Sequence, residues 1–308
     1  MVNMSDEYQN KKQPEILESR PKTPSRMAEG MAMHRLAETM LPEDVRIFSD
    51  PYAIHFITPE ILKFAAEHPR EAEQKVQEME NLFPGLGNSI RARVRYFDLI
   101  LKECISHNFA QLIILGAGYD TRPYRIPEID SNFMVFEVDH PETQSVKKEI
   151  IRRIFGTFPD NVTYIPLNLD TGDLDVALSS SCFSELKKTL VIMEGLIMYL
   201  SSDSIHRIFQ YISKKYPVGS KILFDYYPES VVSGEKNEYA KNIVKFTQLN
   251  GEPLKFGIPD HAERNFLSQW NFADIRIIRS EEYKNLLFTG KNADRSVCDF
   301  LSFMEVTI

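Results

Sequence analysis

The sequence predicts an α/β fold with a doubly wound, mostly parallel sheet of seven strands. Short segments rich in Ile, Val, Leu and Phe alternate with amphipathic segments of helical period over residues 112–225. The first apolar segment leads directly into the turn Gly116-Ala-Gly118, and the second ends on Asp139. Strands and helices that alternate at this spacing are typical of a parallel sheet with helices on both faces.

The five parallel strands are expected to be short and apolar, because such strands are buried on both faces. They span residues 112–115, 133–138, 162–167, 190–193 and 221–225. Near the end of the chain, 275–278 and 297–308 also look like strands. No convincing long helix separates these last two, which favours an antiparallel pair at one edge of the sheet.

Two helices are predicted between the parallel strands, over 141–155 and 202–216. Pro141 suits the first turn of the first helix, and Pro217 ends the second. In 141–155 the apolar side chains are expected to face inward and the basic ones to face solvent. The apolar residues are Val146, Ile150 and Ile154, and the basic ones are Lys147, Lys148, Arg152 and Arg153.

A longer helix over 89–107 carries a single apolar stripe. The stripe consists of Ile90, Val94, Phe97, Leu101 and Ile105. Arg93 lies on its flank, whereas Arg91 and Arg95 point further toward solvent. Arg93 is therefore the arginine of this helix best placed to face the interior.

Composition argues against several classes of protein. The net charge of −8 offers no electrostatic support for nucleic-acid binding. The three cysteines are far apart, which fits a reducing compartment better than a disulfide framework. No apolar signal-peptide core is visible, and the longest apolar run, 190–200, is interrupted by Glu194. We expect a cytoplasmic protein that binds neither nucleic acid nor membrane; the sequence does not indicate its oligomeric state.

The turn after the first strand predicts a site for an adenosine-containing cofactor. Asp139 follows Gly116 by 23 residues, where an acid reaches the ribose hydroxyls in such folds. A dinucleotide site needs a third glycine beneath the pyrophosphate, but this chain has Thr121 there, preceded by Asp120. Because a carboxylate at Asp120 would repel phosphate and attract an ammonium group, the residues favour S-adenosylmethionine.

Two more strand ends carry polar residues. Glu194 follows the strand 190–193, and burying a carboxylate without a partner is costly. It is interpreted either as half of a structural salt bridge or as a group that faces a cationic cofactor. Asn168 could bond the adenine amine, although Asn168-Leu169-Asp170 is equally typical of a turn. The seven histidines show no metal-ligand spacing, so no metal site is predicted.

With these residues in view, the chain resembles the leucine carboxyl methyltransferase family, a Rossmann-like branch of the class I S-adenosylmethionine-dependent methyltransferases. It is most similar to the microbial polyketide-type O-methyltransferases of that family. The matching segments are Ser25-Arg26, Ala32–Arg35, Asp50–Ala53, Arg93–Asp98, Leu115–Arg122, Phe136–Pro141 and Glu194–Leu200. The chain departs from the family at Asn168, where an acid is common, but an amide can still bond adenine.

The resemblance implies a set of cofactor contacts. Gly116, Ala117 and Gly118 would lie under the methionine moiety, with Asp120 and Gly195 beside it. Asp139 would hold the ribose, and Asn168 and Leu169 would flank the adenine. Glu194 would face the ammonium group. Arg93 would hold the methionine carboxylate. A basic residue near the N-terminus also contacts the site in the family. Arg35 is the better match, and His34 is one position away.

On this basis we expect one domain, 25–308, behind a polar, aperiodic segment, 1–24, interpreted as a flexible tail. Its expected parts are an N-terminal helical cap (25–108), a cofactor-binding core (109–228), an insertion or lid (229–270) and closing antiparallel strands (271–308). The cap should contain short helices at 25–39 and 50–56. A charged helix should follow at 59–82, in which Pro69 favours a break.

The resemblance also implies methyl transfer to oxygen, with a small carboxylic acid or polyketide-like acceptor preferred over a protein C-terminal carboxylate. Transfer from a sulfonium requires alignment and desolvation, and a carboxylate acceptor needs no general base, whereas a phenol does. We expect Arg93 and Tyr199 to act as catalytic residues that orient the acceptor oxygen. The alternatives are an NAD-dependent oxidoreductase and a non-catalytic adenosine-binding module. Binding of S-adenosylmethionine and S-adenosylhomocysteine but not NADH would support the transferase, and binding of none of them would support the module.

Overall fold

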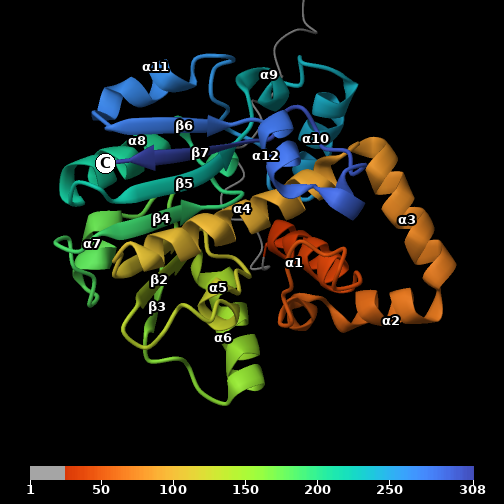
Figure 1. Ribbon diagram of the computed structural model, residues 1–308, viewed down its shortest axis with the longest axis horizontal. Helices are drawn as coiled ribbons and strands as arrows, with labels where there is room; N and C mark the ends of the chain where they lie inside the picture. The colour runs from red at the N-terminus through yellow and green to blue at the C-terminus, as the bar shows by residue number, and fades with distance from the viewer. Residues whose placement is uncertain (1–24) are drawn as a thin grey trace, which may run out of the picture.

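The computed structural model describes residues 25–308 as a sheet between layers of helices (Figure 1). The segment interpreted as a flexible tail, 1–24, lies outside the described residues. The seven strands are β1 (Gln111–Leu115), β2 (Met134–Asp139), β3 (Val162–Pro166), β4 (Thr189–Met193), β5 (Lys221–Tyr226), β6 (Asp274–Ile278) and β7 (Ser302–Thr307). Their order is β3-β2-β1-β4-β5-β7-β6. Strands β1 to β5 run parallel and β7 runs antiparallel to both of its neighbours, which confirms the predicted fold class.

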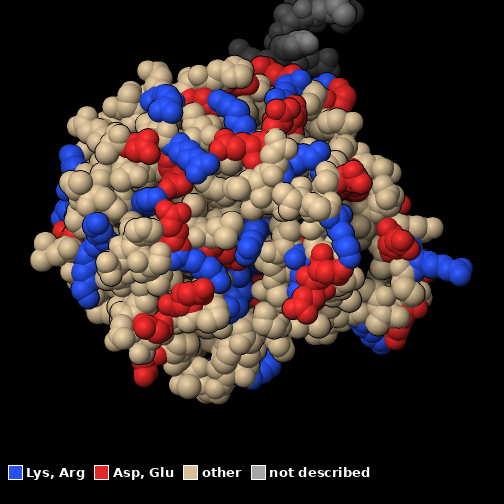
Figure 2. All heavy atoms as spheres, in the orientation of Figure 1, with Lys and Arg blue, Asp and Glu red and all other residues tan. Residues whose placement is uncertain are grey.

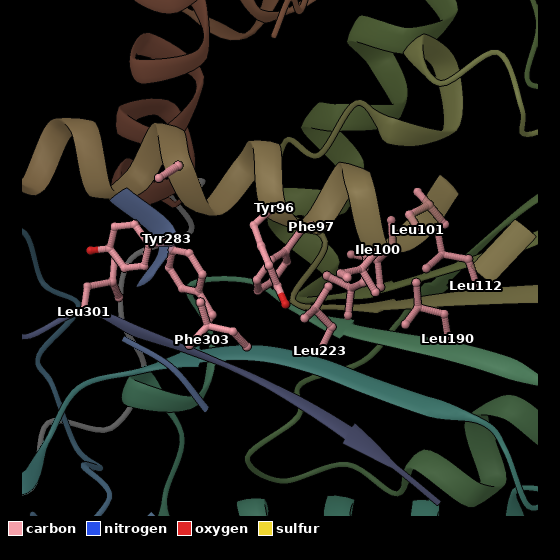
Figure 3. Packing of buried hydrophobic residues seen from close by; sticks show 14 of the residues in the cluster. Tyr96, Phe97, Ile100, Leu101, Leu112, Leu190, Leu223, Tyr283, Leu301 and Phe303 are labelled. Atoms are coloured by element: carbon pink, nitrogen blue, oxygen red, sulfur yellow. The ribbon is translucent and has the colours of Figure 1, made fainter. Parts of the chain in front are cut away.

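Helices cover the sheet because successive side chains of each strand point to opposite faces. Leu112 and Ile114 of β1 pack with α4 (Leu86–Ser106), and Figure 3 shows Phe97 and Leu101 of that helix directed at the strands. Ile113 and Leu115 instead join the cluster that contains α7 (Leu174–Ser179) and α8 (Ser202–Lys215). The predicted stripe of α4 is buried except for Ile105, which is half-buried.

The N-terminal helices are α1 (Arg26–Thr39), η1 (Ala53–Phe56), α2 (Pro59–Glu67) and α3 (Pro69–Leu82). The predicted break of the third segment is confirmed: α2 ends at Glu67, and Pro69 begins α3. Helix α1 lies beside α4, whereas α2 and α3 form an arm at the periphery of the molecule (Figure 1). Neither α2 nor α3 contains a fully buried residue, and among these four helices only α1 lines the cavity described below.

After β5 the chain forms α9 (Glu229–Val232), α10 (Glu238–Leu249), α11 (Glu263–Leu267) and η3 (Ser268–Trp270). Only the short helices α12 (Ser280–Leu287) and η4 (Gly290–Asn292) lie between β6 and β7 in this segment, and the predicted antiparallel pairing of these strands is confirmed. One prediction here was wrong: β7 begins at Ser302 rather than 297. The reason is packing on α4: Tyr283 stacks on Phe303 at 4.4 Å and donates to Ser89 Oγ at 2.9 Å. The backbone of Cys298 also donates to Ser89 Oγ, at 3.0 Å, which holds this segment out of the ladder.

The interior face of α6 (Pro141–Phe155) also differs from the prediction. Lys147, expected on the solvent side, is 1% exposed and pairs with the buried Glu137 of β2 at 2.8 Å. Thr143, Lys147 and Ile151 are four residues apart and share the buried face, while Val146 and Ile150 pack against the N-terminal helices. Burial raises the pKa of Glu137 to about 7, although the charge of Lys147 opposes that change.

Within residues 25–308, no helix combines the length and apolar character needed to cross a bilayer. Figure 2 shows basic and acidic side chains interspersed over the face in view. Two short helices remain: α5 (Arg122–Arg125), a single turn that follows the glycine turn, and η2 (Ile197–Tyr199), which follows β4.

Candidate active site

A cavity of about 860 Å³ lies at the carboxyl ends of β1, β2 and β4, within the range usual for small-molecule sites. The sheet order reverses between β1 and β4, and ligands of open α/β sheets bind at such a point. Helix α1 and the loop 249–252 form the opposite wall. The predicted site residues that line it are Arg35, Arg93, Gly116, Ala117, Gly118, Asp120, Asp139, Asn168, Glu194, Gly195 and Tyr199. Leu169 does not, because its side chain packs in the core.

The glycine turn packs closely against Leu196 and lines the cavity. Gly116 has φ +66°, and a Cβ there would lie 2.6 Å from Leu196 Cδ1. The N–H of Gly118 donates to Asp139 Oδ2 at 2.6 Å, and the N–H of His140 donates to Oδ1 at 2.6 Å. Burial raises the pKa of Asp139, although these two donors oppose the change. A pyrophosphate would need the Gly118 N–H and a long helix behind the turn, and α5 spans only four residues.

Asn168 lies at the rim of the cavity, at the end of β3. Its Oδ1 accepts the backbone N–H of Asp170 at 2.9 Å, so the turn interpretation of this segment is confirmed. Asn168 also lines a smaller adjoining cavity of about 280 Å³ together with His140, Tyr199 and Lys255. The turn therefore leaves the Asn168 side chain in the wall of the site.

Charged residues beneath the cavity form one connected group, here called the ion-pair cluster. Its members are Arg93, Asp98, Asp120, Arg122, Arg125, Glu194 and Asp225. Glu194 accepts from Arg93 Nε at 3.1 Å and from Arg122 Nη1 at 2.6 Å, so it is a salt-bridge partner that also lines the cavity. Three guanidinium groups face four carboxylates, which leaves a formal charge of −1.

Arg122 is the centre of this cluster, and the sequence did not indicate its role. The side chain is 2% exposed and contacts Asp98 at 2.8 Å and Asp120 at 2.5 Å, in addition to Glu194. Burial would raise the pKa of Asp120, but the charge of Arg122 outweighs it and holds that pKa at about 2. Asp120 is thus ionised but paired, rather than the free carboxylate that the sequence suggested.

Arg93 faces the interior, as predicted. Its Nη1 donates to Asp225 Oδ2 at 2.6 Å, and its Nη2 lies 3.2 Å from the Met31 sulfur. Asp225 also accepts the N–H of Gly195 at 2.6 Å. In the sequence Asp225 was visible only as the end of a predicted strand, and a carboxylate at the end of a core strand was the one available signal.

The structure distinguishes Arg35 from His34. Arg35 lines the cavity, pairs with Asp50 at 2.7 Å and donates to the Tyr119 carbonyl at 2.6 Å. Burial lowers the pKa of His34 to about 3, with help from Arg91, Arg93 and Arg35, and its ring faces Gly87 rather than the cavity. Arg35 therefore connects α1 to the loop that follows the glycine turn.

A contact that the sequence did not indicate joins two segments that line the cavity. Ser25 Oγ lies 3.0 Å from both carboxylate oxygens of Glu252, and the N–H of Met27 donates to Glu252 at 3.2 Å. Lys255 pairs with Asp170 on the far side of the same loop. The N-terminal end of α1 is thereby joined to the loop after α10.

Comparison with known proteins agrees with this geometry. The family model described as leucine carboxyl methyltransferase matches residues 28–213, more than half of the chain. A Bacillus subtilis protein named "Putative S-adenosyl-L-methionine-dependent methyltransferase YktD" is 24% identical over 254 residues, which cover 82% of this chain and 81% of that protein. A Mycolicibacterium gilvum protein with the same description, without a gene name, is 30% identical over 200 residues, covering 65% and 74%.

Solved structures resemble the fold. A duf574 family protein from Streptomyces avermitilis has a TM-score of 0.61 at 11% identity, covering 92% of this chain and 97% of that one. A structure from Thermobifida fusca, titled as a putative methyltransferase, has a TM-score of 0.55 at 13% identity, covering 93% and 95%. At these identities the likeness supports the fold alone. The extent of the family match identifies this chain as a member of the leucine carboxyl methyltransferase family.

Proposed function

We propose that this S-adenosylmethionine-dependent methyltransferase transfers its methyl group to an oxygen of a small acceptor, and that the acceptor group is a carboxylate. One observation carries the cofactor part of the proposal: the ion-pair cluster of formal charge −1 lies beneath the cavity that contains a glycine turn whose amide already binds Asp139. S-adenosylmethionine carries a net positive charge and no phosphate. It therefore fits this site where a dinucleotide would not.

The proposed cofactor contacts follow the positions of the side chains. Each oxygen of Asp139 accepts one backbone N–H and keeps a lone pair for a ribose hydroxyl. Glu194 would receive the ammonium group, and Arg93 Nη2, which has only a weak sulfur acceptor nearby, would donate to the carboxylate. The methionine moiety would lie over Gly116 and Gly195, where side chains are absent, and Asn168 would contact the adenine.

The acceptor side is proposed to lie between α1 and the loop after α10. Met27, Met31, Leu196 and Leu249 supply an apolar, adaptable wall. The contact between Ser25 and Glu252 joins the two sides of this wall. The cavity volume of about 860 Å³, which the cofactor would share with the acceptor, supports a small acceptor over a protein C-terminal carboxylate.

Methyl transfer can be tested with labelled S-adenosylmethionine against small carboxylic acids, phenols and C-terminal peptides. We expect label on a carboxylic acid, and we expect base to release it, because methyl esters hydrolyse and methyl ethers do not. A reaction without the protein is the control for background transfer. Base-stable label on phenols, or label on peptides alone, would contradict the proposed acceptor class.

Replacing Tyr199 with phenylalanine tests its proposed role in orienting the acceptor. Burial, together with Glu252, raises the pKa of Tyr199 well above its usual range, so the hydroxyl remains protonated and can donate but cannot act as a base. We expect kcat to fall by about tenfold, the effect of one lost hydrogen bond. The pH profile of kcat should keep its shape between pH 6 and about 9. Loss of a limb in that profile would show that Tyr199 exchanges a proton.

A further inference from the structure

We propose that Asp225 is a positioning residue, which holds the guanidinium of Arg93 in the orientation that binds the cofactor's carboxylate. The inference rests on the proposed contact between Arg93 and the methionine carboxylate. Asp225 is fully buried and does not line the cavity, so it would act through Arg93 and not on the ligand.

Asp225 binds two parts of the site that are far apart in the sequence: Arg93 of α4 and the backbone of Gly195. Its Oδ2 accepts Arg93 Nη1 from α4, and its Oδ1 accepts the N–H of Gly195 from the segment after β4, both at 2.6 Å. Met193 pairs with Phe224, so Asp225 and Glu194 follow neighbouring positions of β5 and β4 at the same sheet edge. A carboxylate at this position can therefore bind the arginine and the cavity backbone at once.

These contacts leave one nitrogen of Arg93 for a ligand. Nε is bound to Glu194 at 3.1 Å and Nη1 to Asp225, whereas Nη2 has the Met31 sulfur at 3.2 Å. Gly195 has φ +61°, and a Cβ there would lie 3.3 Å from Nη1 and 3.4 Å from Nη2. The guanidinium thus lies against a bare backbone with its remaining donor toward the cavity. A thioether is a weak acceptor, which an incoming carboxylate can replace.

The test compares two ligands that differ in the amino-acid group. S-adenosylhomocysteine carries the ammonium and carboxylate groups, and 5′-methylthioadenosine lacks both. For Asp225→Asn we expect the Kd of S-adenosylhomocysteine to rise about tenfold or more, while that of 5′-methylthioadenosine changes by less than about twofold. Calorimetry of the full chain provides both values. Unchanged binding of both ligands, or an equal loss for both, would overturn the inference.

Two additional variants keep the result interpretable. Glu305→Gln is the matched control, because it removes the Lys221 ion pair at the opposite end of β5 and should leave both Kd values unchanged. If Asp225→Asn does not fold, Asp225→Glu keeps the charge but moves the carboxylate. It should also weaken S-adenosylhomocysteine selectively, and an unchanged Kd would overturn the inference.

Arg93→Ala separates the two proposals. No selective loss of S-adenosylhomocysteine in this variant would refute the Arg93 contact itself. A selective loss in Arg93→Ala, but none in the Asp225 variants, would refute only the positioning role of Asp225.

Discussion

Replacing Arg93 with alanine is expected to lower kcat/KM for S-adenosylmethionine by about a hundredfold. Truncation of one member of a buried, hydrogen-bonded charge pair costs about 2–5 kcal/mol, much of it because the partners remain unpaired. Arg93 is 4% exposed and would leave Glu194 and the fully buried Asp225 without their shared guanidinium. Most of the change should appear in KM, since the proposed contact forms with the bound cofactor as well as in the transition state.

Steady-state kinetics at varied S-adenosylmethionine concentration measures this effect. Arg295→Met is a matched control, because Arg295 also pairs with a buried carboxylate, Glu38, at 2.8 Å, but does not line the cavity. The control should lose stability with little change in KM. If the kcat/KM of Arg93→Ala equals that of the control, Arg93 does not contribute to cofactor binding.

Replacing Arg122 with methionine is expected to lower the free energy of unfolding by about 3–5 kcal/mol, the usual result when one partner of a buried ion pair is removed. The substitution leaves Asp98, Asp120 and Glu194 without their common cation at 2.5–2.8 Å. Urea denaturation measures the change. Arg276→Met is the exposed control: its pair with Glu282, at 3.0 Å, should contribute at most about 1 kcal/mol. If both variants lose the same free energy of unfolding, the buried ion pairs of Arg122 do not stabilise the protein more than an exposed pair does.

The stability that Arg122 provides should depend on pH in a defined direction. The folded-state pKa of Asp120 is about 2, against an ordinary value of 3.8, so the folded protein binds this proton less readily than the unfolded chain. The pair therefore stabilises fully above pH 3.8, and this stability is lost as pH falls toward 2. The difference in the free energy of unfolding between the natural protein and Arg122→Met should therefore become smaller as pH falls from 3.8 toward 2. A difference that is constant down to pH 2 would show that Asp120 is not involved.

Local sequence signals predicted the parallel sheet and the glycine turn well. Strands buried on both faces must be apolar along their whole length, and a turn that passes close under a ligand needs glycine, so both features are visible in short segments. The predictions failed where a distant element decided the outcome. Lys147 is polar and lies on an apparently solvated face, but Glu137 of β2 brings it into the interior. The segment before β7 is apolar enough for a strand, but Ser89 of α4 binds its backbone instead.

The same distinction applies to the site. The sequence by itself determined which residues stand at the ends of β1, β2 and β4, because strand ends and turns depend on neighbouring residues. Only the tertiary structure decided how their charges are balanced. Arg93 and Asp225 are 132 positions apart, and Arg122 meets partners from α4, its own turn and the segment after β4. Such pairings depend on how helices and strands pack in three dimensions. A buried charge needs a partner of opposite charge, and the packing decides which residue lies within hydrogen-bond distance.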